Sequence, residues 1–267
     1  MARIHDQAQG FSLAAEEYEK SRPEYPAEAI DFLREVLQIG PGSRVLEVGA
    51  GTGKFTRALI PIGAELIAMD PIAQMRSVLH RVLPNVPVLA GQAEGIPLRD
   101  GSVQAIVVAQ AFHWFRGAEA LREFARVLGP KGRVALVWNV RDERVAWVRR
   151  FTEIIDRFYE GGPYGEMPSA APRHRSGEWR TAFSAGSAFP ALEHRQFAFR
   201  QPMTPEQVVL RAWSVSFIAR RSPEERAQIG EEIRSLLEAD PATRGRSVVE
   251  YPYLTDVYWA ERVDRAA

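Results

Sequence analysis

Three glycines at alternate positions, Gly49, Gly51 and Gly53, form the part of the sequence whose spacing points most directly to chemistry. Glycine has no Cβ, so the chain can turn sharply there and a ligand can lie directly against the main chain. A helix-period segment follows from position 54, and the unpaired amides at a helix start favour an anionic or polar group. The sequence therefore predicts that this turn holds a nucleotide-like ligand.

Two common glycine motifs fit this turn poorly. A dinucleotide fingerprint beginning at Gly49 needs a small residue at position 54, where Lys54 stands. A phosphate-binding loop that uses Gly53 and Lys54 needs glycine at position 48 and Ser or Thr at position 55, where Val48 and Phe55 stand. A nicotinamide-dependent oxidoreductase therefore remains only as an alternative, together with a cofactor-binding protein that has no turnover.

The segments around the turn predict an α/β fold with a doubly wound, mostly parallel sheet. Short apolar runs rich in β-branched residues alternate with helix-period segments, which is typical of βαβ units. The expected strands are 44–48, 65–69, 86–90, 103–109 and 133–138, and the expected helices are 27–37, 54–60, 72–83 and 118–128.

The later third of the chain predicts an inserted helical cap. A helix is expected over 142–159, and Thr204 and Ser222 each precede a proline and a capping-box residue, so two more helices should begin there. We expect one domain over 1–267, with its core at about 27–140 and late strands at about 193–200 and 247–260. The cap is expected at about 141–190 and 203–245, beside a loop over 161–172.

Polar and aromatic residues follow the predicted strands, at the edge where ligands bind in parallel sheets. Asp70 follows the second strand, where its carboxylate can accept hydrogen bonds from a ribose diol or cap the next helix. Gln110, Phe112, His113 and Trp114 follow the fourth strand, and Trp138 and Asn139 follow the fifth.

Composition limits the classes of partner. Lys+Arg and Asp+Glu both number 34, and the formal net charge is zero, so no global field attracts nucleic acid or an anionic membrane. The chain has no cysteine, which excludes thiolate catalysis and cysteine metal sites, and no metal site is expected. There is no signal-peptide pattern and no long apolar run, so we expect a cytoplasmic protein without a membrane segment. The oligomeric state is not predicted.

The pattern E/D-x-G-x-G-x-G, matched by Glu47, Gly49, Gly51 and Gly53, resembles the class I S-adenosylmethionine-dependent methyltransferases. Residues 92–98 resemble the segment of that family that meets adenine, with Gln92 where many relatives have an acid. Residues 11–26 resemble the N-terminal segment of its small-molecule branch, which includes ubiquinone-biosynthesis-type and trans-aconitate-type enzymes. The resemblance implies a Rossmann-like methyltransferase fold, S-adenosyl-L-methionine as cofactor and a small-molecule substrate.

The resemblance also implies a set of cofactor contacts. Tyr18 and Arg22 would lie at the methionine end, Asp70 would hold the ribose, and the residues after it would cover the adenine. The full cofactor set is Tyr18, Arg22, Glu47, Gly49, Ala50, Gly51, Gly53, Asp70, Pro71, Ile72, Met75, Gln92, Ala93, Glu94 and Gln110.

The acceptor side is less specific. His113 is the candidate general base, because the pKa of histidine suits proton transfer near neutral pH; it can equally position the cofactor or cap a helix. Phe112, Trp114, Trp138 and Asn139 are the candidate substrate contacts, with core packing or turn closure as alternatives. The arginines at 141, 144, 149, 150, 173 and 175 fit either an acidic substrate or solvated helix faces.

Overall fold

The computed structural model describes residues 22–158, 177–184, 186–190, 192–215 and 217–263. Tyr18, the rest of the N-terminal segment over 11–21, the predicted loop over 161–172 and the basic residues at 173–175 lie outside the described residues.

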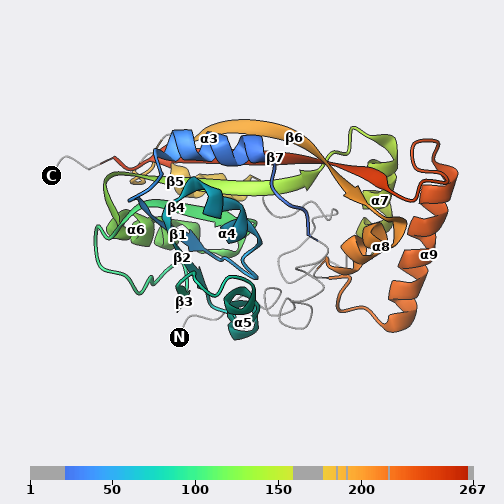
Figure 1. The fold of residues 1–267 in the computed structure, drawn as a ribbon, viewed down its shortest axis with the longest axis horizontal. Coiled ribbons are helices and arrows are strands. Elements are labelled where there is room, and N and C mark those ends of the chain that lie inside the picture. Colours follow the sequence, from blue (N-terminus) through green and yellow to red (C-terminus); the bar gives the residue numbers. More distant parts are fainter. Residues whose placement is uncertain (1–21, 159–176, 185, 191, 216, 264–267) are drawn as a thin grey trace. The chain divides into compact units, whose positions relative to one another are not determined.

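The described strands form one seven-stranded sheet in the order β3-β2-β1-β4-β5-β7-β6 (Figure 1). Neighbours from β3 to β5 are all parallel, which confirms the expected fold class. The strands are β1 Arg44–Val48, β2 Glu65–Asp70, β3 Val88–Ala90, β4 Val103–Ala109, β5 Leu128–Arg141, β6 Glu193–Met203 and β7 Val249–Glu261.

The last two strands complete the sheet from late in the sequence. The amide of Arg262 donates to Gly132 O at 2.8 Å, and that of Asp142 donates to Pro252 O at 3.1 Å. Residue numbers therefore rise along β5 as they fall along β7, so this pair is antiparallel. The strand β7 lies close to the expected 247–260, whereas β5 is longer than the expected 133–138, because its first residues, Leu128 to Gly132, lack the apolar pattern that marks a strand in the sequence.

The chain divides into two compact units, and β5, β6 and β7 contribute residues to both. The core unit comprises residues 24–139, 176–197 and 255–267, and the helical unit comprises 1–23, 140–175 and 198–254. The core unit contains α3 Ala27–Leu37, α4 Lys54–Leu59, η2 Ile60–Ile62, α5 Ala73–Val82, η3 Phe112–Trp114, α6 Gly117–Val127 and η4 Glu178–Phe183. The helical unit contains α7 Ala146–Asp156, α8 Pro205–Trp213 and α9 Pro223–Ala239. The boundaries expected for a core domain and its cap stay a prediction.

The core unit buries its strands on both faces. Ile30 and Leu33 of α3 and Phe55 of α4 pack with Val45 and Val107 of the sheet in one apolar cluster. Side chains alternate along a strand, so the intervening residues point to the opposite face. These residues are also buried at 1% exposure or less: Leu46, Val48, Ile106, Val108, Val134 and Leu136. Parallel strands covered in this way leave their carboxyl ends as the accessible edge for polar side chains.

The helical unit has an apolar core of its own. Phe151 of α7, Val208 of α8 and Ile233 of α9 pack with Tyr251 and Tyr253 of β7. No described helix combines the length and apolar character that crossing a membrane requires.

Both capping boxes expected from the sequence are present. The Thr204 hydroxyl accepts from the Gln207 amide at 3.2 Å, and the Ser222 hydroxyl accepts from the Glu225 amide at 3.2 Å. The Glu225 carboxylate in turn accepts from the Ser222 amide at 2.9 Å, so the box fixes the first turn of α9.

We expect Ser222→Ala to lower the free energy of unfolding by about 1 kcal/mol, because the Glu225 amide loses its acceptor. Ser222→Asp keeps an acceptor at the same position and should behave like the wild type. Urea denaturation of the three proteins, followed by circular dichroism, measures the difference. Equal midpoints for wild type and Ser222→Ala would show that the cap does not stabilise this helix.

Candidate functional site

The three glycines of the turn have different structural roles. All three have left-handed backbone angles, with φ of +75° at Gly49, +57° at Gly51 and +87° at Gly53. A Cβ on Gly49 would lie 2.7 Å from the Ala111 Cβ, and one on Gly53 would lie 2.8 Å from the Leu79 Cγ. A Cβ on Gly51 would meet no described atom within 4 Å. Gly49 and Gly53 therefore permit close packing, whereas Gly51 borders open space that a ligand can fill.

Lys54 occupies the position that argued against two other glycine motifs. Its side chain is largely buried, and its Nζ lies 2.8 Å from the Glu24 Oε1 in an ion pair within the core unit. The amine is thus engaged with a carboxylate from before α3. This pairing explains why a lysine stands where a dinucleotide fold places a small residue.

The Asp70 carboxylate joins the ends of two neighbouring strands. Its Oδ2 accepts from the Gly51 amide at 2.9 Å, and its Oδ1 accepts from the Ile72 amide at 2.8 Å. Burial raises the pKa of Asp70, and these two amides and Arg76 oppose the rise. Each oxygen retains a lone pair, so the carboxylate can still accept hydrogen bonds from a diol.

Glu47, at the end of β1, is a buried carboxyl group. Burial raises its pKa from 4.5 to about 8, the Thr56 hydroxyl opposes the rise, and the nearby Asp70 adds to it. The Thr56 hydroxyl, on α4, donates to the Glu47 Oε2 at 2.5 Å. Thr56 was not among the expected site residues. The only signal was its place in the first turn of the helix after the glycines.

The segment after β3 is fixed to the start and body of α6. The Glu94 Oε1 accepts from the Arg116 amide at 2.7 Å, and the Ile96 amide donates to the Glu123 Oε2 at 2.9 Å. Ala93 is buried, and Gln92 and Gly95 form an isolated antiparallel bridge. Met75 of α5 is also buried, so its side chain belongs to the core of the unit.

Gln110 and Asn139 link the ends of β4 and β5. Gln110 has a left-handed φ of +58°, and its Nε2 donates to the Asn139 O at 3.3 Å. The Asn139 Nδ2 donates to Glu24 O at 2.9 Å, and its Oδ1 accepts from the Thr255 hydroxyl at 2.6 Å. Asn139 therefore ties three separate chain segments together, which is the turn-closing role left open by the sequence.

His113 receives a hydrogen bond from a buried tryptophan. The Trp138 Nε1 lies 3.3 Å from the His113 Nδ1, and the indole N–H can only donate. The Nδ1 must then be unprotonated, so a neutral His113 carries its proton on Nε2. The His113 ring also contacts Trp114, with 4.7 Å between centroids.

An aromatic cluster lies around Trp138, the hydrogen-bond partner of His113, and includes residues that the sequence did not reveal. Phe112 is 1% exposed, Trp138 is fully buried, and Trp179 of η4 packs against both, with centroids 6.2 Å and 4.8 Å away. Tyr258 of β7 completes the cluster at 5.0 Å from Trp179. Trp179 and Tyr258 are distant in sequence from the strand ends, and no local pattern marks them.

The two remaining expected cofactor contacts are Arg22 and Tyr18. Arg22 belongs to the helical unit, where its Nη2 donates to the Ser214 O at 3.1 Å. Tyr18 is outside the described residues. The structure therefore brings together Glu47, the glycines, Asp70, Pro71, Ile72 and Gln110 at the strand ends of the core unit. Within the described residues, no group of three or more His, Asp or Glu side chains is arranged to hold a metal ion.

Comparison with known sequences decides the family. A methyltransferase-domain family matches residues 46–136. A methyltransferase of Mycobacterium tuberculosis that is itself uncharacterised is 38% identical over 250 residues, covering 94% of this chain and 94% of its own. The chain belongs to the methyltransferase family. A methyltransferase-like protein of Schizosaccharomyces pombe is 35% identical over 94% of this chain and 95% of its own length.

Solved structures share the fold of this methyltransferase. A protein of Anaeromyxobacter dehalogenans, provisionally a type II methyltransferase, superposes with a TM-score of 0.69 at 23% identity, covering 90% of this chain and 97% of its own. A Haemonchus contortus phosphoethanolamine N-methyltransferase, solved with phosphomonomethylethanolamine and S-adenosylhomocysteine, gives a TM-score of 0.54 at 15% identity. It covers 99% of this chain and 61% of its own. The resemblance inferred from the glycine pattern is confirmed.

The buried Glu47 makes the stability of the ligand-free protein depend on pH. Its pKa is about 8 when folded and about 4.5 when unfolded, so the folded state holds an additional proton between these values. Unfolding releases that proton, and stability should fall as pH rises through this window, by up to about 1.4 kcal/mol per pH unit. Glu47→Gln stays neutral, so the variant should match wild type near pH 5 and exceed it near pH 8.

Urea denaturation of wild type and Glu47→Gln at several pH values between 5 and 8 measures the difference between their free energies of unfolding. The titration of the other groups contributes equally to both proteins and cancels in this difference. Parallel curves for wild type and Glu47→Gln would show that Glu47 is already charged at neutral pH.

Proposed function

We propose that this methyltransferase binds S-adenosyl-L-methionine at the strand ends of its core unit and methylates a small-molecule acceptor. The observation that carries the proposal is the pairing of Gly51 with Asp70. A left-handed glycine with open space at its Cα lies beside a carboxylate that retains free lone pairs. This arrangement suits a flat nucleoside whose ribose hydroxyls donate to Asp70 while its chain runs over Gly51.

The remaining cofactor contacts form part of the same proposal. Pro71, Ile72 and Met75 would form the apolar side of the adenine pocket, with Gln92, Ala93 and Glu94 on the other side. Glu47, Gly49, Ala50, Gly53 and Gln110 would line the methionine portion. The family and the S-adenosylhomocysteine bound by the structural neighbour from Haemonchus contortus support this assignment.

The cofactor supplies the methyl group on a sulfonium centre, so the protein has to bind, orient and exclude water. The aromatic cluster around Phe112 and Trp138 is suited to exclude water from the acceptor. Trp114 and Asn139 complete the proposed substrate side, although both hydrogen-bonding ends of the Asn139 amide already have partners in the fold.

His113 is the proposed catalytic residue. With Nδ1 accepting from Trp138, its Nε2 carries the proton, and the ring can take an acceptor's proton only by exchanging tautomers or losing that bond. Its alternative role is to position the reactants through the Trp138 contact.

The relatives found are methyltransferases, and the oxidoreductase alternative has no support among them. The family also makes the chain an enzyme, in place of a cofactor-binding protein without turnover.

We expect Gly51→Val to weaken S-adenosylhomocysteine binding by at least about a hundredfold, because the branched side chain fills the space at Gly51 and strains a left-handed backbone. Gly42→Val is the matched control: Gly42 has a φ of +86° and open space around its Cα, but it lies in the turn before β1. Isothermal titration calorimetry measures both. Equal losses in the two variants would mean that backbone strain alone is responsible.

For His113, we expect single-turnover methyl transfer to lose its dependence on a group of histidine-like pKa in His113→Ala, with a rate loss of about 10²-fold. Trp138→Phe removes the indole donor but keeps the ring, so it should shift that pH dependence without abolishing it. Rates of His113→Ala that equal those of wild type across pH would remove the general-base role.

A further inference from the structure

The helical unit contains a buried arginine that is paired only with hydroxyl groups. Arg211 of α8 is 6% exposed, its Nε donates to the Tyr253 hydroxyl at 3.2 Å, and its Nη1 donates to the Ser214 hydroxyl at 3.3 Å. No described carboxylate forms an ion pair with it. A buried guanidinium is normally neutralised by an acid, since desolvation of an unpaired charge is costly.

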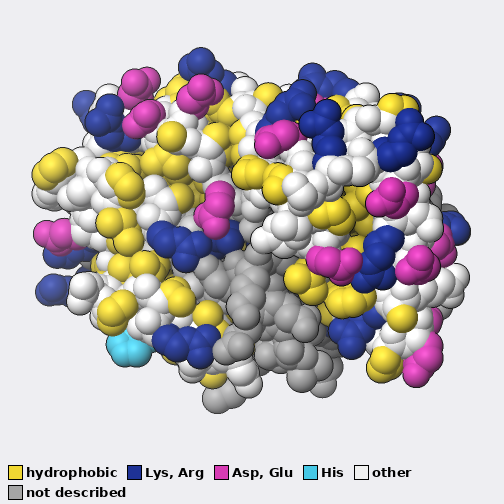
Figure 2. Space-filling view, turned by 45° about the vertical axis from the view of Figure 1, so that its right-hand side comes forward, with side chains coloured by type: hydrophobic (Ala, Val, Ile, Leu, Met, Phe, Trp, Pro, Cys, Tyr) yellow, Lys and Arg dark blue, Asp and Glu magenta, His cyan; other side chains and the backbone are white. Residues whose placement is uncertain are grey.

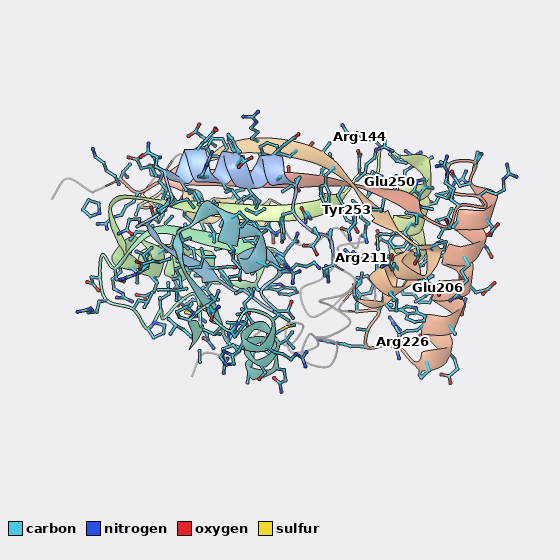
Figure 3. The ribbon with its side chains drawn as sticks, viewed as in Figure 1. Arg144, Glu206, Arg211, Arg226, Glu250 and Tyr253 are labelled. Carbon is cyan, nitrogen blue, oxygen red and sulfur yellow. The ribbon has the colours of Figure 1, made fainter. Side chains whose placement is uncertain are left out.

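Next to this arginine lies a tyrosine whose hydroxyl is unused. Tyr251 is fully buried, and its hydroxyl has no hydrogen-bond partner within the described residues. Its ring stacks on that of Tyr253, with 4.8 Å between centroids and 20° between planes, so both tyrosines project from the same face of β7. Arg211 and Tyr253 are labelled in Figure 3, and Tyr251, stacked on Tyr253 and influenced by the charge of Arg211, belongs to the same cluster.

A second buried arginine adds to the positive charge. Arg141, at the end of β5, is 8% exposed and stacks over Phe151, 5.7 Å from the ring centroid. Burial lowers the pKa of Arg141, and repulsion from Arg211 lowers it further, while Tyr251, Tyr253 and Asp156 oppose this. Burial raises the pKa of Tyr251, and the Glu143 carboxylate adds to this rise. Two cations thus share the cluster with two nearby acids, and neither acid forms a described ion pair with Arg211.

We propose that Arg211, Tyr251 and Arg141 bind the carboxylate of a small organic acid inside the helical unit. The Nη2 of Arg211 has no described partner, so the guanidinium can present this nitrogen to one carboxylate oxygen while Tyr251 donates its hydroxyl to the anion. Asp156 and Glu143 also act on this cluster, so a carboxylate group, which brings one negative charge into it, fits better than a phosphate dianion, which brings two. Trp147 and Phe151, which pack edge-on against Tyr251, give the remainder of the ligand an apolar surface.

Every residue of this site lies in the helical unit, so the inference does not depend on the proposed function. Surface arginines of the same unit behave differently. Arg144 is 71% exposed and pairs with Asp142 at 2.7 Å. Figure 2 shows basic and acidic side chains interspersed on the exposed surface, where pairs of this kind contribute little. Arg144 therefore supplies a matched control.

The test uses the full chain with and without S-adenosylhomocysteine, in low-chloride buffer, with succinate as the probe. Calorimetric titration should show saturable binding of succinate, no binding of the neutral succinamide, and at least tenfold weaker binding of inorganic phosphate. Arg211→Met should weaken succinate binding at least a hundredfold, and Tyr251→Phe about tenfold. Arg144→Met should leave the affinity unchanged.

Thermal unfolding of the same variants separates ligand binding from a structural role. Without succinate, Tyr251→Phe should melt at or above the wild-type temperature, because it removes an unpaired buried hydroxyl. Loss of affinity together with equal or higher melting temperature supports the site. Any of three results would overturn the site: wild type does not bind succinate, Arg211→Met and Tyr251→Phe both bind it with unchanged affinity, or phosphate binds more tightly than succinate. Failure to bind S-adenosylhomocysteine would instead refute the proposed function and leave the succinate result to be read separately.

Discussion

The hydrogen bond from the Gly51 amide to the Asp70 carboxylate is the interaction on which the candidate site depends. It joins the turn after β1 to the end of β2, and the second Asp70 oxygen fixes the start of the next segment through the Ile72 amide. Asp70 can reach the Gly51 amide because β1 and β2 are parallel neighbours that end at the same edge. The glycine turn keeps its open left-handed form because a charged acceptor holds its amide.

Two buried carboxyl groups lie at this same edge of the sheet. Burial raises the pKa of both Glu47 and Asp70, and the nearby Asp70 raises that of Glu47 further. A carboxyl pair of this kind is tolerated where backbone amides and a hydroxyl satisfy its oxygens. The helical unit buries a group of the opposite sign, because the Arg211 guanidinium donates to the hydroxyls of Tyr253 and Ser214. Each unit thus buries ionisable side chains, at a cost in free energy, at the place where we propose that a ligand binds.

Local sequence patterns are sufficient to predict the strands and helices that carry the proposed cofactor site. The strand β1 and the helix α3 begin and end where the sequence pattern places them, because burial on both faces produces unbroken apolar runs and regular helix periods. The capping boxes at Thr204 and Ser222 were equally local. The Lys54 position could also be interpreted, since its identity excluded two motifs, although its pairing with Glu24 depends on the fold.

The acceptor side resisted prediction for a physical reason. Trp179 and Tyr258 contact Trp138 from η4 and the antiparallel β7, and no periodicity in the sequence specifies that arrangement. The same holds for Arg211, which looks like an ordinary polar position on an amphipathic helix until its burial against Tyr253 is seen. The residues proposed to hold the nucleoside come from consecutive strand ends and therefore carry a local motif. The residues proposed to bind a second ligand come from insertions and late strands, so their chemistry appears only when packing has brought them together.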